Sequence, residues 1–187
     1  MKRKAVKAAR KVVKPGSRKV GKSKVVKKVV RKAKKKVAPV PAGYHTVTPH
    51  LVCRGAADAM AFYTRAFGAK ERLRMATPDG TVAHAEMRIG DSIIMLGEEM
   101  PEMGASAPPT VGGSPVNVFL YVKDVDTWFA RAVAAGATGD MPPMNMFWGD
   151  RYCKLTDPFG HKWSIATHVE DVSGKEMGRR MAAEMGG

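Results

Sequence analysis

The hydrophobic and polar positions of this chain follow two different periods. Segments in which apolar and polar residues alternate, or in which β-branched and aromatic residues gather, predict strands at His45–Cys53, Lys70–Met75, Val82–Ile89, Ser92–Leu96, Val116–Val122, Arg151–Thr156 and Lys162–Thr167. Segments with apolar residues three or four positions apart predict helices at Ala56–Phe67, Val125–Ala135 and Val172–Met185. Turn sequences rich in Gly, Pro and Asp separate these segments. Strands and helices mixed in this order predict an α+β fold.

The strand and helix pattern occurs twice in the same order. A shift of 68 positions superposes the end of the first helix, at Gly68, on the end of the second, at Gly136. Self-similarity at a fixed spacing indicates a duplicated module. We therefore predict two tandem βαβββ modules, at about residues 46–100 and 115–170, that pack into one core. The segment Met141–Phe147 contains two prolines and is predicted as a connection.

Polar and aromatic side chains gather around one predicted hairpin in the second module. The turn Asp157–His161 (DPFGH) combines a Pro with fixed φ, a Gly that permits positive φ, and an Asp that bonds to the backbone ahead of it. Trp148, Asp150, Arg151 and Trp163 flank this turn. Such a density of polar and aromatic groups indicates a ligand cavity, and a surface hairpin with paired charges is the alternative.

A second candidate site lies on the predicted strand Val82–Ile89. Alternation places His84, Glu86 and Arg88 on one face of this strand. Neighbouring ionisable groups of this kind hold a polar ligand or form a proton-transfer pair. A solvated outer face of the sheet is the alternative explanation of the same pattern.

The positive charge of the chain is concentrated at its beginning. Residues 1–37 hold 18 of the 32 Lys and Arg residues, and no acidic residue precedes Asp58. We predict that this segment is disordered and that the Pro-rich residues 38–43 link it to the folded part. Its composition resembles the tails of linker histones and bacterial histone-like proteins. A solubilising extension, an anionic membrane surface and an import signal are alternatives.

Dense positive charge predicts non-specific binding to the phosphates of DNA or RNA. The residues expected to make these contacts are Lys2, Arg3, Lys4, Lys27, Lys28, Arg31, Lys32, Lys34, Lys35 and Lys36. The two cysteines, Cys53 and Cys153, are too few for a disulfide scaffold and are expected to be buried thiols. No apolar run approaches the roughly 20 residues that span a bilayer. We therefore expect a cytoplasmic protein, associated with the nucleoid if the tail binds DNA.

The last predicted helix, within residues 173–187, has features of its own. Ser173 and Glu176 match the capping-box pattern of a helix start. Met177, Met181 and Met185 fall on one face at four-residue spacing. Because methionine side chains adapt to irregular surfaces, we expect this helix to dock on its own domain, with a second subunit as the alternative.

Five strings of this sequence together resemble the vicinal oxygen chelate superfamily, which contains glyoxalases, bleomycin-resistance proteins and extradiol dioxygenases. They are FYTRAFGA, AHAEMRIGDSIIML, YVKDVDTWFARAVAAGA, FWGDRY and DPFGHKWSIATH. The match is most similar to the PhnB-like branch and covers about residues 46–172. The resemblance implies a glyoxalase/bleomycin-resistance-type open barrel, here at residues 44–172, that binds a small organic ligand. It also implies a homodimer.

The resemblance also implies where metal-dependent members hold their metal. Those positions fall here on Thr48, Asn117, Ile94 or Met95, and Ser164, and none of these is a histidine or a carboxylate. We therefore predict no resident metal or other cofactor. An unrecognised divalent-metal site remains an alternative, with ligands drawn from His50, His84, Glu86, Asp150 and His161.

The resemblance places the polar residues of both candidate sites in the cavity. His84 and Glu86 are the candidate catalytic pair, and the candidate ligand-binding residues are Trp148, Asp150, Arg151, Trp163, His50 and Asn117. The leading prediction is a PhnB-like protein that binds a small organic ligand without the usual catalytic metal. One alternative is a lyase or dioxygenase-type enzyme that uses His84 and Glu86 or an unrecognised metal set. Another is a nucleoid-associated protein in which the barrel is a scaffold.

Overall fold

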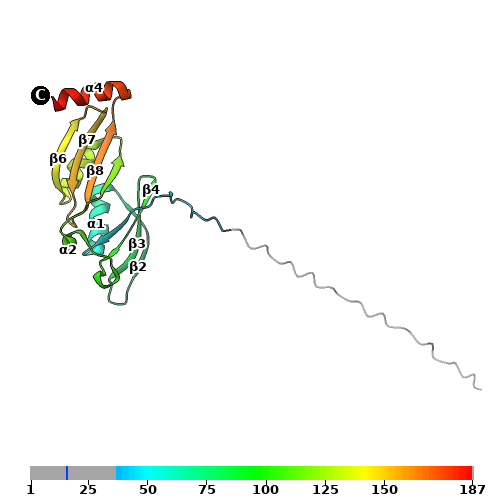
Figure 1. The fold of residues 1–187 in the computed structure, drawn as a ribbon. Helices are drawn as coiled ribbons and strands as arrows, with labels where there is room; N and C mark the ends of the chain where they lie inside the picture. Colours follow the sequence, from blue (N-terminus) through cyan, green and yellow to red (C-terminus); the bar gives the residue numbers. More distant parts are fainter. Residues whose placement is uncertain (1–15, 17–36, 187) are drawn as a thin grey trace, which may run out of the picture. The chain divides into compact units, whose positions relative to one another are not determined.

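The computed structural model describes Gly16 and residues 37–186 of the chain (Figure 1). The chain divides into two units, Met1–Val37 and Ala38–Gly187, and the fold described below is that of the second. The predicted disorder and nucleic-acid contacts of residues 1–36 lie outside the described residues. None of the helices in the described part combines the length and the apolar character needed to cross a membrane.

The first module forms a four-stranded sheet with one helix. Its elements are β1 (His50–Cys53), α1 (Ala56–Phe67), β2 (Lys70–Ala76), β3 (Val82–Ile89) and β4 (Ser92–Glu98). The strand order is β1-β4-β3-β2, with β1 parallel to β4 and the other pairs antiparallel. Strand β1 begins later than predicted, directly after Pro49, which has no N–H to donate to a ladder.

The second module repeats this arrangement. Its elements are β5 (Asn117–Tyr121), α3 (Val125–Ala134), β6 (Thr138–Asn145), β7 (Asp150–Thr156) and β8 (Lys162–His168), and the strand order is β5-β8-β7-β6. The predicted α+β fold of two similar modules is therefore confirmed. A connection with a short 3-10 helix, η1 (Pro101–Met103), and a single-turn helix, α2 (Pro108–Val111), joins the modules.

Strand β6 corrects the prediction that residues 141–147 form a connection. The strand spans Thr138–Asn145 and contains both prolines, Pro142 and Pro143. It pairs only with β7 and is the edge of its sheet, and register shifts interrupt the pairing between Met141 and Met144. An edge strand tolerates proline because one side of it needs no ladder hydrogen bonds.

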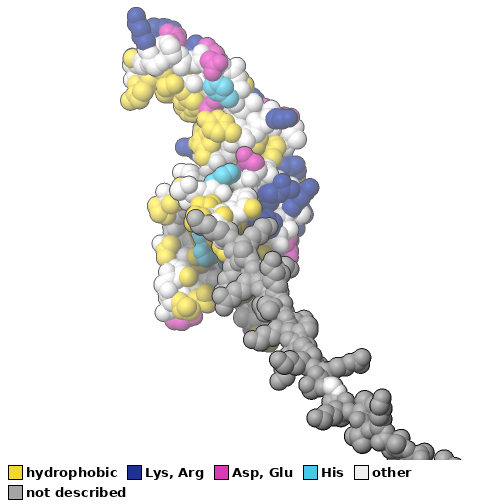
Figure 2. Space-filling view, turned by 90° about the vertical axis from the view of Figure 1, so that its right-hand side faces the viewer, with side chains coloured by type: hydrophobic (Ala, Val, Ile, Leu, Met, Phe, Trp, Pro, Cys, Tyr) yellow, Lys and Arg dark blue, Asp and Glu magenta, His cyan; other side chains and the backbone are white. Residues whose placement is uncertain are grey.

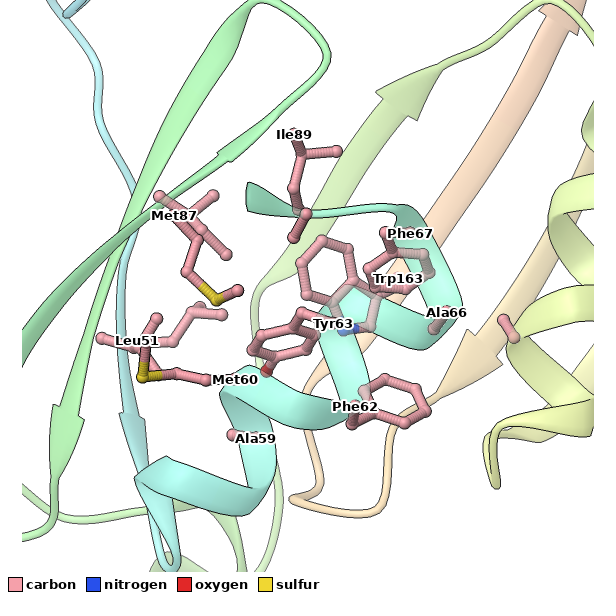
Figure 3. Close-up of a cluster of buried hydrophobic side chains, with 14 of the residues drawn as sticks. Leu51, Ala59, Met60, Phe62, Tyr63, Ala66, Phe67, Met87, Ile89 and Trp163 are labelled. Atoms are coloured by element: carbon pink, nitrogen blue, oxygen red, sulfur yellow. The ribbon is translucent and has the colours of Figure 1, made fainter. Parts of the chain in front are cut away.

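The hydrophobic core is shared by the two modules. Helices α1 and α3 pack against each other, and aromatic side chains of α1 reach the second sheet. The Trp163 ring of β8 lies 4.6 Å from the Phe67 ring and 5.4 Å from the Tyr63 ring, measured between centroids (Figure 3). All three side chains are buried. Because this cluster draws on both modules, neither module contains the whole core.

The turn between β7 and β8 is fixed by the buried carboxylate of Asp157. Its Oδ1 accepts the backbone N–H groups of Phe159 and His161 at 2.9 and 2.8 Å. Its Oδ2 accepts the Tyr63 hydroxyl at 2.8 Å and the Trp163 indole N–H at 2.9 Å. Asp157 therefore both shapes its own turn and ties the second module to helix α1 of the first.

Both cysteines are buried free thiols, as predicted. Burial, and then the nearby Asp157, raises the pKa of the Cys53 thiol to about 12, and burial raises the pKa of Cys153 to about 11. The Cys53 sulfur lies 3.6 Å from Nε2 of His161. Neither thiol is a nucleophile at neutral pH, because nucleophilic attack requires the thiolate.

The C-terminal helix α4 (Gly174–Met185) follows the second sheet (Figure 1). The Ser173 hydroxyl accepts the backbone N–H of Glu176 at 3.3 Å, which is one half of the predicted capping box. Arg180 forms a two-bond ion pair with Glu170, at 2.7 and 2.8 Å. Met177 and Met181 face the segment that leads into β7, and they share a groove of about 670 Å³ with Phe147 and Trp148.

Candidate functional site

Each sheet has one face covered by helices and one open face. In the first sheet, Leu51, Met87 and Leu96 belong to the core beneath α1. Alternation therefore turns His84 and Glu86 of β3 to the other side. In the second sheet, core residues of β5 alternate with Asn117, Phe119 and Tyr121. We call the sides without helices the open faces.

The predicted catalytic pair lies on the open face of the first sheet. The His84 Nε2 atom is 3.7 Å from Oε1 of Glu86, and Nη1 of Arg72 is 3.7 Å from Oε2. The His50 ring stands edge-on to the His84 ring, with centroids 5.9 Å apart. Burial, and then the neighbouring His84, lowers the pKa of His50. At 3.7 Å the two groups are beyond hydrogen-bond distance, so proton transfer between them requires a closer approach or a bridging water.

A buried carboxylate organises the open face of the second sheet. Asp150 is 3% exposed, and its Oδ2 accepts the Tyr121 hydroxyl and the Trp148 indole N–H, both at 3.1 Å. Its Oδ1 lies 2.8 Å from Nδ1 of His168. The other ring nitrogen of His168 is 3.0 Å from the Asp171 carboxylate. Asp171 and then Asp150 raise the pKa of His168.

Aromatic rings surround Asp150 on this face. The Tyr152 ring is stacked on Phe119, with centroids 5.8 Å apart, and stands edge-on to Trp148 at 5.7 Å. The Tyr152 hydroxyl shares a hydrogen bond of 2.8 Å with the Ser164 hydroxyl. The sequence predicted Trp148 and Asp150 but missed Tyr121 and His168. Alternation of β5 from Asn117 reaches Tyr121, whereas His168 requires the register of β8 with β7.

Two predicted ligand-binding residues point away from the open face. Arg151 follows Asp150 on β7 and therefore lies on the helix-covered side, where its guanidinium forms two hydrogen bonds of 2.6 Å with Asp126 of α3. Trp163 has no exposed surface. The structure thus places Arg151 in an ion pair and Trp163 in the core.

A cleft of about 540 Å³ lies between β1 and β5. Two predicted ligand-binding residues, His50 and Asn117, line it, together with His161 from the turn after β7. Pro108 and Val111 of α2 contribute to its wall. Apolar side chains and backbone make up most of the remaining lining, and none of the lining residues in the described part of the chain is Asp, Glu, Lys or Arg.

The positions at which the resemblance implies a metal carry neutral side chains. Within residues 37–186, no three His, Cys, Asp or Glu side chains are grouped so that they can hold an ion. At the positions that the resemblance indicates, the Thr48 hydroxyl donates to the His45 carbonyl and the Ser164 hydroxyl bonds to Tyr152. These neutral groups do not fit a divalent metal that requires histidine and carboxylate ligands.

Comparison of the sequence with known proteins identifies relatives that align over most of their own length. The uncharacterized protein Rv0887c of Mycobacterium tuberculosis (strain ATCC 25618 / H37Rv) is 43% identical over 141 residues, which is 74% of this chain and 83% of that protein. Protein YjdN of Escherichia coli (strain K12) is 30% identical over 140 residues, which is 64% of this chain and 92% of that protein.

Solved structures of similar proteins have a similar fold. TioX from Micromonospora sp. ML1 has 29% sequence identity and a TM-score of 0.53, over 66% of this chain and 98% of that one. A glyoxalase/bleomycin resistance protein/dioxygenase family enzyme from Burkholderia phytofirmans PsJN shares the fold, with 20% identity and a TM-score of 0.53 over 68% and 98% of the two chains. The family model of the Glyoxalase/Bleomycin resistance protein/Dioxygenase superfamily matches residues 44–165. Since this match spans more than half of the chain, the protein belongs to that superfamily.

Proposed function

We propose that this protein is a PhnB-like member of its superfamily that binds a small organic ligand in the cleft between β1 and β5. The observation that supports this proposal is the cleft itself, where His50, Asn117 and His161 stand among apolar side chains. Pockets for small molecules combine an apolar lining with a few polar groups that orient the ligand. The volume of about 540 Å³ is in the usual range for such pockets.

The lining favours an uncharged ligand. Burial lowers the pKa values of both His50 and His161, so that neutral imidazoles face the cleft at pH 7. Among residues 37–186, no other ionisable side chain lines it. A charged ligand would lose its hydration without gaining a counter-charge, which disfavours it. Asn117 can donate to a carbonyl or accept from a hydroxyl of the ligand, and this selects orientation.

The experiment is a binding titration of the full-length protein with neutral aromatic compounds that fit the volume of the cleft and with their carboxylate counterparts. We expect the neutral compounds to bind more tightly, and Asn117→Leu to weaken them roughly tenfold through the loss of one buried hydrogen bond. Lys154→Ala, on an exposed position of β7, is the control and should leave affinity unchanged. Tighter binding of the carboxylates, or equal affinity of wild type and Asn117→Leu, would contradict the proposal.

The proposal includes no resident divalent metal, in keeping with the neutral side chains at Thr48, Asn117 and Ser164. Elemental analysis of the purified protein should then give well below one zinc, nickel or iron per chain. One metal per chain, lost in His84→Ala or Glu86→Gln, would overturn this part of the proposal.

A second candidate function is acid–base catalysis of the lyase or dioxygenase type. The 3.7 Å separation of His84 and Glu86 on an open face favours it. Turnover of a reactive carbonyl or a catechol by the full-length protein, abolished in His84→Ala and retained in the exposed control Glu71→Gln, would support it. Retention of turnover in His84→Ala would exclude this pair.

The basic residues 1–37 are proposed to contact nucleic acid, on the strength of 18 Lys and Arg residues without an acidic one. Retention on duplex DNA should fall steeply with salt for the full chain and be lost in a chain that starts at Ala42. Equal retention of the two proteins would contradict the proposal.

The scaffold role is tested by localisation in the cell. Localisation to the nucleoid that depends on residues 1–37 but survives Asn117→Leu would favour that role. A diffuse cytoplasmic distribution would oppose it.

We also propose that the protein forms a homodimer. Large apolar side chains lie exposed on β2 and β5, with Met75 57%, Phe119 46% and Tyr121 67% exposed. Figure 2 shows hydrophobic side chains gathered along one side of the molecule. A second copy that covers such surfaces would remove them from water. Sedimentation equilibrium should give twice the chain mass, and Tyr121→Glu should shift it to the monomer; a monomeric wild type would contradict the proposal.

A further inference from the structure

A strap of chain, residues 41–49, crosses the open face of the first sheet before β1 begins. Ile93 of β4 is outside the core cluster, yet it is only 4% exposed. A methyl group built on Gly43 would lie 3.7 Å from the Ile93 Cδ1 atom, so the strap passes directly over this side chain. The carbonyl of Pro49 accepts the Met95 N–H at 2.8 Å and fixes the end of the strap to β4.

One side chain anchors the strap near the predicted catalytic pair. Residues 41–43 and 45–47 are exposed, whereas Tyr44 is half-buried. The Arg72 guanidinium lies over the Tyr44 ring, 5.4 Å from its centroid, and reaches Glu86 at 3.7 Å. The Glu86 carboxylate raises the pKa of Tyr44. Arg72 thus links the Tyr44 ring of the strap to the Glu86 carboxylate.

These contacts shield Glu86 on the open face. Its side chain is 14% exposed, whereas that of His84, on the same face of β3, is 29% exposed. We propose that Tyr44 is the latch of the strap and that proton transfer by Glu86 and His84 requires the strap to be released. The catalytic part of this proposal rests on the acid–base function proposed above, whereas the latch itself does not.

The latch gives Glu86 two environments. With the strap in place, the Tyr44 ring holds Arg72 beside the Glu86 carboxylate, which limits the access of a substrate to that carboxylate. With the strap released, the carboxylate retains Arg72 and His84 and gains solvent or ligand. A ring under a guanidinium is a modest contact, so that the closed state is favoured by a factor of about fivefold.

The latch is tested by labelling carboxylates of the full-length protein with a water-soluble carbodiimide and glycine ethyl ester, followed by peptide mass spectrometry. In Tyr44→Ala, the labelling rate of Glu86 should rise about twofold, in the ratio of the exposed fractions of His84 and Glu86, which are 29% and 14%. Tyr44→Phe keeps the ring under Arg72 and should give a smaller rise.

His45→Ala, on the exposed neighbouring position, is the matched control and should leave the Glu86 rate unchanged. The rate at Glu71 reports on folding and should be the same in all variants. Equal Glu86 rates in wild type and Tyr44→Ala would overturn the latch, whatever the outcome of any catalytic assay. A higher Glu86 rate in a protein without turnover would retain the latch and reject only the acid–base function.

Discussion

Replacing Tyr63 by phenylalanine tests the tie between the two modules. The substitution removes a hydroxyl that donates to Asp157 at 2.8 Å and keeps the ring that packs on Phe67 and Trp163. A hydrogen bond to a charged group contributes about 1.5–3 kcal/mol to stability. Because the same carboxylate oxygen still accepts from Trp163, it is not left without a partner. We therefore expect Tyr63→Phe to lower the free energy of unfolding by about 2 kcal/mol.

The assay is urea unfolding of wild type and Tyr63→Phe, with a lower midpoint and an unchanged dependence on urea concentration in the variant. Tyr152→Phe is the matched control, because its buried hydroxyl bonds to the neutral Ser164 hydroxyl and should contribute only about 1 kcal/mol. Burial, and then Asp157, raises the pKa of Tyr63 well above 10, so that the difference from wild type should stay constant from pH 6 to pH 9. If Tyr63→Phe lowers the free energy of unfolding no more than Tyr152→Phe does, the Tyr63–Asp157 contact does not stabilise the protein as a charged hydrogen bond would.

Three further predictions follow from other parts of the fold. Gly149 has a φ of 98°, and an added Cβ would lie 2.1 Å from a backbone oxygen of the segment before α4, so Gly149→Ala should cost more than about 2 kcal/mol in thermal unfolding. Gly178→Ala, on an open helix position, should instead stabilise by up to about 1 kcal/mol, and equal effects of the two substitutions would refute the clash. Two carboxylates raise the pKa of His168 above 6.5, so its contribution to stability should be full below that pH and disappear as the pH rises through the raised value. Parallel stability profiles for wild type and His168→Gln between pH 5 and pH 9 would contradict this. Cys53, with a pKa of about 12, should react with iodoacetamide at pH 8 only after unfolding, and rapid reaction of the native protein would disprove its burial.

The sequence predicted the helices and most strands because their periodicity reflects burial on one side. Strand β6 was missed because two prolines in succession argue against a central strand, while only the fold reveals that this strand is an edge. The placement of His84 and Glu86 on one face followed from alternation alone. Alternation also places the neighbours Asp150 and Arg151 on opposite faces of β7. The prediction put both in the cavity because it treated them as one motif.

Other parts of the site depend on contacts that no local pattern records. Tyr44 reaches Arg72 only because the strap crosses the sheet, and a single tyrosine after a Pro-rich linker carries no signal of that path. Trp163 resembled a ligand-stacking residue beside a polar turn, whereas the packing of α1 against the second sheet buries it completely. Long-range packing thus decided which of the aromatic residues near the hairpin face the open side.

The two halves of this protein are similar in design but unequal in what they bury. Helix α1 buries seven of its side chains and α3 only two, and the aromatic residues of α1 close over a tryptophan from the other half. Severed within residues 112–115, the polypeptide would yield two fragments, each with an unfinished interior. Such fragments should remain largely unstructured apart and regain order only on mixing, as complementing pieces of one cooperative unit.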